Sequence, residues 1–402
     1  MSTIAVESHS ANRVTDLSHT SFQGYLRSDG RAGVRNYLLV LSTVALTNRW
    51  ADLISSKHKD ALAITGDFLR GLRGNDQLLQ DDVLAKLAAH PNVGAVLILC
   101  FDRFSADQWR KRIKSAGQSA TVLSLMDQKG MTGALEEAQK ELSNLDKIRR
   151  KLKRTSIPLS KLTIALECGG SDATSAICAN PSIGCFVTSL VESGGSSIIS
   201  ETAEFIGAED VVRERAVSSE VAEQILTCIL AADERTDEEG ERYRGVNPTH
   251  ENIEAGLTTL VEKSMGAVCK IGDLSIDGCL EFAQEPPGSG LYFMDTPFFS
   301  PVSLSGMAAS GAQLVLFALG VFNPSGNPLV PTIKVCGNVN TLATWNDSID
   351  VSVSGLVDRS ISLEEAAQKI ATMVMKTASG QESRAEHWGE GQVIVPKTRA
   401  LI

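Results

Sequence analysis

Short β-branched runs alternate with amphipathic stretches through the first half of the chain, and this alternation constrains the fold more than any other feature. The strand-like runs are Tyr37–Thr43, Ala61–Thr65, Val93–Cys100 and Ala120–Leu125, with helical periodicity between them. Strands separated by helices pair in parallel, with helices on both faces of the sheet. The sequence therefore predicts an α/β fold, with a first doubly wound domain over residues 21–155.

A long helical pattern from Thr132 to Leu152, followed by Pro158, marks the predicted boundary between two domains. A chain of 402 residues exceeds the size at which a single hydrophobic core stops growing. The alternation resumes after the boundary and closes with a strand-like Gln392–Pro396. We predict two domains with mainly parallel, doubly wound sheets. The second, residues 156–402, carries the main site motifs, and residues 1–20 form a disordered polar tail.

Charge and hydropathy exclude several classes of protein. The formal net charge is −10 and no long basic block is present, which argues against a nucleic-acid-binding surface. The polar N-terminus lacks the apolar core of a signal peptide, and no stretch reaches the roughly 18 apolar residues that a membrane span needs. The eight cysteines form no CxxC pair, as expected for reduced core residues. We therefore expect a cytoplasmic protein that contacts neither nucleic acid nor membrane.

A glycine-rich turn, Glu167–Asp172, directly follows the apolar run Leu162–Leu166. Ligands of open parallel sheets bind at the carboxyl ends of strands, on turns of this kind. The adjacent Gly169 and Gly170 would let backbone N–H groups approach an anion, and a following helix N-terminus would favour a carboxylate. The same residues also fit a tight turn in which Asp172 caps the helix.

Carboxylates follow two later strand-like runs. Glu201 and Glu204 come just after Ser196–Ile199, where either could act as a base or a metal ligand. Acids favoured in the first turn of a helix are an equally good interpretation. Asp295 follows Leu291–Met294, and an ordinary turn explains it as well.

Lys334 lies inside the otherwise apolar Thr332–Cys336, and Asn338 follows shortly after. A lysine in a buried parallel strand is costly unless it is paired, so Lys334 is a candidate catalytic residue. The alternative is that its ammonium group snorkels to the edge of the sheet. His250, in the polar Asn247–Asn252, could be a ligand or a base, although most loop histidines are neither.

Three arginines, Arg27, Arg31 and Arg35, precede the first predicted strand together with Asn36 and two glycines. Guanidinium groups bind carboxylates through paired hydrogen bonds, so this segment is a candidate carboxylate clamp. An exposed turn held by Arg–Asp pairs fits the composition equally well.

These segments, in this order, resemble the altronate and galactarate dehydratase family, which includes the similar large subunit of sulfolactate sulfo-lyase. The resemblance runs from Gly24 to the C-terminus. It is carried by Gly24–Arg27, Asp29–Asn36, Glu167–Asp172, Ala179–Pro181, Glu201 with Glu204, Gly207–Glu209, Asn247–Pro248, Glu262–Gly266 and Val330–Val335. It implies a lyase, typically iron-requiring, that dehydrates a sugar acid or related hydroxy acid to a 2-keto-3-deoxy acid.

The resemblance places Cys168, Asp172, Glu201, Glu204 and Lys334 in the site. We assign Lys334, Glu201 and Asp172 to catalysis, and Cys168 and Glu204 to a divalent metal, Fe2+ in the family. The residues assigned to the substrate are Arg27, Arg31, Arg35, Asn36, Gly169, Gly170, Ser171, Asn180, Asp295 and Asn338. The family's small N-terminal domain is a separate small subunit in split members, so we expect such a partner, and an oligomer, besides a small hydroxy-acid substrate.

The turns after the first three predicted strands depart from the family pattern. The family usually has a cysteine where this chain has Leu46, a His and a Gly-Cys where it has Ile64–Phe68, and Gly-Cys-Glu where it has Leu99–Asp102. Apolar side chains do not replace thiolate or imidazole ligands. Beside a dehydratase, two alternatives therefore stay open: a (2R)-sulfolactate sulfo-lyase large subunit, and a non-catalytic homologue that binds small acids without the family metal.

Overall fold

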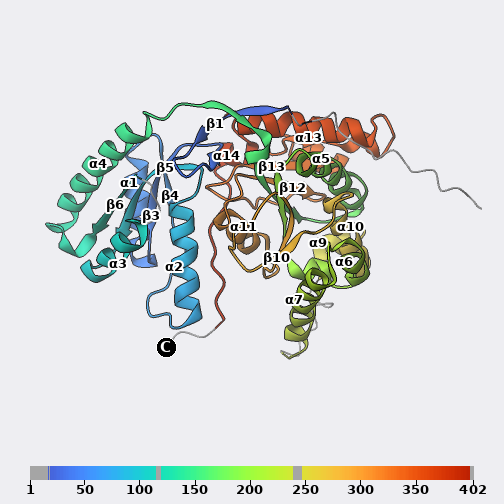
Figure 1. The fold of residues 1–402 in the computed structure, drawn as a ribbon, viewed down its shortest axis with the longest axis horizontal. Helices are drawn as coiled ribbons and strands as arrows, with labels where there is room; N and C mark the ends of the chain where they lie inside the picture. Colours follow the sequence, from blue (N-terminus) through green and yellow to red (C-terminus); the bar gives the residue numbers. More distant parts are fainter. Residues whose placement is uncertain (1–16, 18, 115–118, 239–246, 399–402) are drawn as a thin grey trace, which may run out of the picture.

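The computed structural model describes residues 17, 19–114, 119–238 and 247–398. Two parallel β-sheets of different size carry most of the helices, and Figure 1 shows the smaller sheet on the left and the larger one on the right. The prediction of an α/β fold with parallel sheets is confirmed. The polar tail predicted for residues 1–20 lies almost entirely outside the described residues.

The smaller sheet has four parallel strands in the order β4-β3-β5-β6. These strands are β3 (Tyr37–Ser42), β4 (Ala61–Ile64), β5 (Val93–Cys100) and β6 (Ser119–Ser124). The helices that follow them in turn are α1 (Asn48–Ser56), α2 (Asn75–Ala88), α3 (Arg103–Lys114) and α4 (Gly130–Arg149). The chain adds β4 on one side of β3 and β5 on the other, so the winding direction reverses between β3 and β5.

The larger sheet has seven parallel strands in the order β10-β11-β9-β8-β12-β13-β14. They are β8 (Thr163–Gly169), β9 (Ser196–Ile199), β10 (Gly278–Leu280), β11 (Gly290–Met294), β12 (Leu314–Leu319), β13 (Thr332–Cys336) and β14 (Val351–Ser352). Its helices are α5 (Asn180–Glu192), α6 (Glu209–Arg215), α7 (Ser219–Glu238), α9 (His250–Glu254), α10 (Leu260–Val268), α11 (Ser300–Ala309), α12 (Val339–Thr344), α13 (Leu363–Ala378) and α14 (Arg384–Trp388). Here the winding direction reverses between β8 and β12.

A small antiparallel sheet links the two halves of the chain. Its strands are β1 (Ser21–Leu26), β2 (Ala32–Gly33) and β7 (Thr155–Pro158), with β1 in the middle. Because β7 leads directly into β8, the pairing of β1 with β7 joins the segment before the smaller sheet to the start of the larger one.

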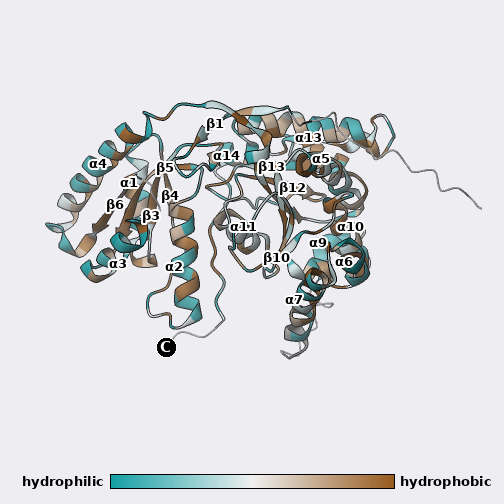
Figure 2. Cartoon of the chain, in the orientation of Figure 1, coloured by the Kyte–Doolittle hydropathy of each residue, from teal (hydrophilic) through white to brown (hydrophobic). Residues whose placement is uncertain are grey.

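Apolar side chains bury both faces of each sheet. On the smaller sheet, α1 and α4 cover one face, and α2 and α3 cover the other. That second face shares one hydrophobic cluster with the larger sheet, since Leu84 and Leu87 of α2 belong to the same cluster as Leu304 and Met307 of α11. Figure 2 shows α4 with hydrophilic and hydrophobic residues in alternation, as expected for a helix with one face in water. The two sheets therefore share part of their core.

The strand predicted at Gln392–Pro396 is wrong, because this segment forms no strand in the structure. Val393 and Val395 are buried, and the Ile394 N–H donates to the Ser305 hydroxyl of α11 at 2.9 Å. The alternating pattern thus reflects packing on a helix instead of strand pairing. Further on, Thr398 bonds to Asp76 of α2, and the segment runs down beside α2 in Figure 1. No helix in the described ranges is long and apolar enough to cross a membrane.

Candidate active site

A pocket of about 390 Å³ lies at the carboxyl ends of the strands where the larger sheet reverses its winding direction. Open α/β sheets bind their ligands at this point, because the loops that leave neighbouring strands diverge there. The turns after β8, β9, β11 and β12 all contribute to its lining. Cys168 and Glu204 form part of the floor, and both are almost fully buried.

A buried lysine joins Cys168 and Glu204. The Lys270 ammonium lies 2.9 Å from the Cys168 sulfur and 3.1 Å from Oε2 of Glu204, and the thiol is 3.1 Å from the same oxygen. Burial alone would raise the pKa of Glu204, but the Lys270 and Lys263 ammonium groups outweigh it and lower that pKa. Burial and the neighbouring Glu204 raise the pKa of the Cys168 thiol well above its usual value. The cluster is therefore a Lys–Glu ion pair with a neutral thiol.

A second carboxyl pair, Glu167 and Glu201, adjoins this cluster. Burial raises the pKa of Glu167 to about 7, against the attraction of Lys270 and the hydroxyl of Ser303, which donates to Glu167 at 2.6 Å. Burial, then the charges of Glu167 and Glu204, raise the pKa of Glu201 well above its usual value, and Glu201 hydrogen-bonds to Glu167. Two carboxyl groups this close cannot both ionise. Burial and the two neighbouring carboxylates therefore favour the protonated form of Glu201, which lines the pocket.

Two residues at the edge of the pocket have backbone conformations that L-residues rarely adopt. Glu201 has φ of 62° and Phe299 has φ of 132°. They are connected, because the Phe299 N–H donates to the Glu201 carboxyl at 3.3 Å, and Thr296 accepts the Glu201 N–H at 2.8 Å. Strained backbone persists where the surroundings enforce it, and it gathers at functional sites. Here the strain is compatible with holding the Glu201 carboxyl towards the pocket.

Lys263 of α10 brings a cation to the pocket lining. Its ammonium donates to the Asn247 side chain at 2.7 Å and lies 4.9 Å from the centre of the Phe298 ring. An ammonium has three donors, so a substrate oxygen can be bound as well.

The adjacent glycines after β8 allow two loops to touch. A Cβ at Gly170 would clash with the carbonyl oxygen of Val321, and a Cβ at Gly169 would lie 2.6 Å from the Asn323 amide. The Val321 N–H donates to the Gly170 carbonyl at 2.7 Å. The two glycines thus let the loops after β8 and β12 come into contact and close this side of the pocket. The predicted approach of their N–H groups to an anion is a separate role.

Two family models match this chain. One, described as D-galactarate/altronate dehydratase, C-terminal, matches residues 159–400, which include the whole pocket; the other, described as D-galactarate dehydratase/altronate hydrolase, second domain, matches residues 24–148. The chain belongs to the D-galactarate/altronate dehydratase family.

Three named relatives in this family extend over most of the chain. (2R)-sulfolactate sulfo-lyase subunit beta of Chromohalobacter salexigens is 31% identical over 388 residues, covering 95% of this chain and 98% of the relative. Altronate dehydratase of Bacillus subtilis strain 168 is 30% identical over 386 residues, covering 90% of this chain and 74% of the relative. Altronate dehydratase of Escherichia coli strain K12 is 27% identical over 380 residues, with the same coverage of 90% and 74%.

Of the residues predicted for the site of this dehydratase-family chain, the structure brings together Cys168, Gly169, Gly170, Glu201 and Glu204. Asp172 lies beside the pocket in its alternative role as a cap, since it accepts the Ser175 N–H at 2.7 Å and the Asn338 amide at 2.6 Å.

The remaining predicted residues of the larger sheet hold loops together. Asn338 caps α12, and Asn180 donates to the Gly266 carbonyl at 2.9 Å. The Ser171 carbonyl accepts from Asn252 at 3.0 Å, and Asp295 accepts from the Thr202 hydroxyl at 2.6 Å. None of the predicted Ser171, Asn180, Asp295 and Asn338 lines the pocket described above.

Lys334 does not reach the pocket. Its side chain is fully buried, its ammonium is ion-paired with Glu390, and it lies 4.7 Å from the centre of the Phe322 ring. Burial lowers the pKa of Lys334, against the pull of Glu390. Phe322 lines the pocket, and Lys334, the predicted catalytic lysine, lies behind its ring. The sequence correctly indicated that a buried lysine in this strand needs a charged partner. That partner is Glu390, which holds Lys334 in the fold and does not line the pocket.

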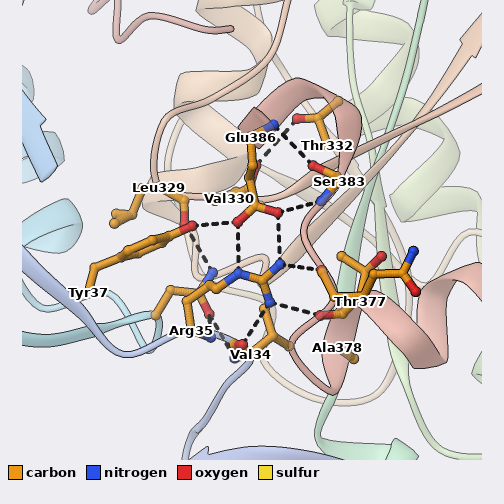
Figure 3. Close-up of polar contacts among 12 residues, drawn as sticks. Val34, Arg35, Tyr37, Leu329, Val330, Thr332, Thr377, Ala378, Ser383 and Glu386 are labelled. Carbon is orange, nitrogen blue, oxygen red and sulfur yellow. Dashed lines mark hydrogen bonds and ion pairs between the residues drawn. The ribbon is translucent and has the colours of Figure 1, made fainter. Parts of the chain in front are cut away.

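The arginines predicted as a carboxylate clamp lie on the amino side of the smaller sheet. Arg27 and Asn36 bond to each other at 2.8 Å, and Arg31 bonds to Asp29 at 2.8 Å. Figure 3 shows Arg35 enclosed by protein groups: Glu386 binds it through both carboxylate oxygens at 2.7 Å. The structure therefore does not bring Arg27, Arg31, Arg35 or Asn36 to the pocket of the larger sheet.

The predicted metal ligands do not fit a metal ion as they stand. Fe2+ at Cys168 and Glu204 would need the position between them, which the Lys270 ammonium takes. Within the described residues, no group of three or more His, Cys, Asp or Glu side chains is arranged to hold a metal. His250 begins the short helix α9 and is exposed. The Fe2+ implied by the family resemblance thus stays an untested prediction.

Sequence reasoning missed Lys270 and Lys263. Lys270 had the same signal as Lys334, a lysine within an apolar run, Ala267–Ile271. Lys263 lies in Glu262–Gly266, which carried the family resemblance without a role being assigned. Both signals could have been used, but only the fold reveals which buried lysine has carboxylates at a strand end beside it.

Proposed function

We propose that this protein is a lyase that removes water from a small hydroxy acid to give a 2-keto acid. The observation that carries the proposal is that Glu201 and Glu204 line one pocket in different surroundings: Lys270 pairs with Glu204 and lowers its pKa, whereas burial and the charges of Glu167 and Glu204 raise the pKa of Glu201. Environments that push two carboxyl pKa values apart are typical of acid and base assignments in enzymes. The dehydratases of the family support the reaction class.

In the proposed reaction, Lys263 binds the substrate carboxylate and Glu204 removes the proton on the adjacent carbon, C2. The electron pair of the C2–H bond forms the C2–C3 double bond as the C3–O bond breaks. Glu201 gives its proton to the departing hydroxyl, so that water leaves. The resulting enol becomes the 2-keto acid. Lys270 stabilises the charge of Glu204 before the proton arrives, and Glu167 keeps the proton on Glu201 until it is needed.

The Fe2+ expected from the family would supply charge stabilisation for the carbanion if it were bound. The proposal does not depend on it, because Lys263 and Lys270 already provide positive charge at this end of the sheet. Metal analysis of the purified protein, together with activity in the presence of a chelator, tests this point. Activity that requires iron would mean that the ion binds elsewhere or displaces Lys270.

A sulfo-lyase is the second candidate, favoured by the match to (2R)-sulfolactate sulfo-lyase subunit beta over 98% of that relative. Its chemistry differs only in the leaving group, which would be sulfite in place of water. That relative is named as a subunit. We therefore propose that this chain, too, works in an oligomer with a separate small subunit, which co-expression and size-exclusion chromatography test.

The deciding experiment incubates the protein with aldonic, aldaric and sulfonated hydroxy acids and measures 2-keto acid and sulfite. A dehydratase gives 2-keto acid without sulfite, and a sulfo-lyase gives both. Glu201→Gln keeps the shape and neutrality of the proton donor but has no proton to give, so turnover should fall about 100-fold or more. Glu214→Gln, on the exposed face of α6, is the matched control and should leave the rate unchanged. Thermal stabilisation by an acid without turnover would instead favour the non-catalytic homologue.

A further inference from the structure

A second pocket, of about 230 Å³, lies at the amino ends of the parallel strands of the smaller sheet. Its lining includes Asn36 just before β3, Gly94 near the start of β5 and Ser119 at the start of β6. The candidate active site lies on the larger sheet instead, and among the described residues the two linings have no member in common. A ligand of the second pocket would therefore bind apart from the proposed chemistry.

Arg27 brings to this pocket a guanidinium group without an acidic partner. Its Nε donates to the Pro91 carbonyl at 2.7 Å, its Nη1 to the Asn36 side-chain oxygen at 2.8 Å and its Nη2 to the Arg35 carbonyl at 2.9 Å. These acceptors are neutral, and within the described residues no carboxylate forms an ion pair with Arg27. Burial lowers the pKa of Arg27 to about 10. A cation withdrawn from water in this way gains from pairing with an anion.

The other charged groups of the lining already have partners. Arg31 donates to Asp29, the one carboxylate among the described lining residues, at 2.8 Å. Arg149 donates to Asp146, outside the lining, at 2.8 Å. Each of these two arginines has one further acidic neighbour outside the lining. An anion that enters the pocket would therefore meet Arg27 as its unpaired cation.

Two glycines let Arg27 and Asn36 take these positions. A Cβ at Gly33 would lie 2.9 Å from Nη2 of Arg27, and a Cβ at Gly94 would lie 2.2 Å from the side-chain oxygen of Asn36. The guanidinium group is thus fixed by close packing and by three hydrogen bonds. A guanidinium group has five N–H groups, so two are left for a ligand. A donor fixed before binding loses little freedom when the ligand arrives.

We propose that this pocket binds a small oxyanion, a carboxylate or a phosphate group, through Arg27. The two remaining N–H groups donate to its oxygens, and the hydroxyls of Ser28 and Ser119 in the lining supply further donors. Apolar side chains complete the lining: Leu26, Ile148 and Leu152. The sequence assigned Arg27 to a substrate carboxylate, and the structure gives the same chemistry a place outside the candidate active site. The proposal does not rest on the lyase function.

Calorimetric titration with inorganic phosphate and with acetate, each against chloride at equal ionic strength, tests the site. Arg27→Gln should weaken binding by at least about 10-fold, since hydrogen bonds to a charged group contribute this much. Lys263→Met, which removes the cation of the candidate active site, should leave this binding in place. Arg103→Gln, on the exposed surface of α3, is the matched control. The tighter of the two anions identifies the group that the pocket takes.

Ser28→Glu gives a test that keeps Arg27 and its hydrogen bonds. Ser28 is exposed and lines the pocket, so the new carboxylate competes with an added anion. Binding should be lost and the melting temperature should rise, whereas Ser28→Gln, of the same size, should do neither. Retained binding in Ser28→Glu overturns the proposal.

The remaining outcomes also decide the matter. Binding that is lost in Lys263→Met and kept in Arg27→Gln places the anion in the candidate active site and overturns the second site. Failure of both anions to bind the native protein overturns it as well. Turnover of hydroxy acids is measured separately, so the lyase function stands or falls on its own experiment.

Discussion

The two parallel sheets of this protein each reverse their winding direction once, yet among the described residues only the larger one places a cluster of almost fully buried charged groups at the reversal. At the end of β8 and β9, four ionisable groups, Glu167, Glu201, Glu204 and Lys270, are almost completely buried together. At the end of β3 and β5, a pocket of about 130 Å³ is lined by Arg70, Asp102 and Arg112, which are all partly open to water.

This difference shows that a reversal of strand order creates a crevice at the end of a sheet, but that the side chains buried there decide which chemistry it supports. In the smaller sheet, the charged groups at the reversal are partly open to water, which screens them. In the larger sheet, removal from water makes each charge depend on its neighbours, and the carboxyl pKa values separate. Phe101, in the segment Leu99–Asp102 where the resemblance leads us to expect Gly-Cys-Glu, lines the smaller pocket. The larger crevice is therefore the better candidate for catalysis.

The largest expected effect is on turnover. Glu201→Gln should lower the rate of 2-keto acid formation by about 100-fold to 10,000-fold, since general acid catalysis contributes this much. Asp102→Asn makes the corresponding change at the smaller sheet and keeps the hydrogen bond that caps α3, so the rate should stay within about twofold. Steady-state kinetics with the best acid of the panel compares them. An equal loss of rate in both variants would contradict the assignment of catalysis to the crevice of the larger sheet.

The next effect is on stability. Lys270→Met leaves the Glu204 carboxylate buried without its cation and should lower the free energy of unfolding by about 3–5 kcal/mol. Arg112→Met removes an ion pair with Asp81 that is partly exposed, and about 0–1 kcal/mol is expected. Urea unfolding measures both. Adding Glu204→Gln to Lys270→Met should recover part of the loss, because no charge is then left unpaired. A double variant less stable than Lys270→Met would contradict the ion-pair description.

A pH effect should follow from Glu167. Its pKa rises from an ordinary 4.5 to about 7 in the folded protein, so between these values the folded state binds more protons than the unfolded state. The stabilisation that the raised pKa of Glu167 gives to the folded state is complete below pH 4.5, and it is lost as the pH rises through 7. Glu167→Gln should therefore flatten the decline of the unfolding free energy over this range, whereas Asp102→Asn should leave it. An unchanged pH dependence in Glu167→Gln would assign the decline to other groups.

A smaller effect concerns the connection between the sheets. Arg35, just before β3, binds Glu386 of α14 and the carbonyls of Thr377 and Gln381, while Tyr37 bonds to Glu386 at 2.7 Å (Figure 3). Arg35→Met should cost about 2–3 kcal/mol, as hydrogen bonds to a largely buried charge contribute.

The matched control for this connection is Arg31→Met, whose ion pair with Asp29 is about one-third exposed or more on each side. It should cost about 0–1 kcal/mol. Guanidinium chloride unfolding compares the two variants. Similar values for both would mean that the Arg35 network does not join the sheets energetically.

The sequence predicted the parallel sheets because apolar strands alternate with amphipathic helices, and this pattern is local. It located Glu201, Glu204 and Cys168 because strand ends converge in any open sheet. It failed to select Lys270 over Lys334, since both lie in apolar runs and only the packing decides which carboxylate each one meets. The Arg35 network could not be foreseen either, because its partners lie more than 340 residues away along the chain.

The close contact between Gly170 and Val321 divides the pocket into parts with different freedom to change over evolutionary time. Any side chain at Gly170 would push the loop after β12 outward and open the floor of the pocket. Substitutions at this position should therefore be removed by selection. The Phe298 and Phe322 side chains meet no such limit, since they contribute side-chain surface to the lining. A descendant that acquires a different acid would therefore keep the glycines and the buried carboxylates and replace the aromatic residues above them.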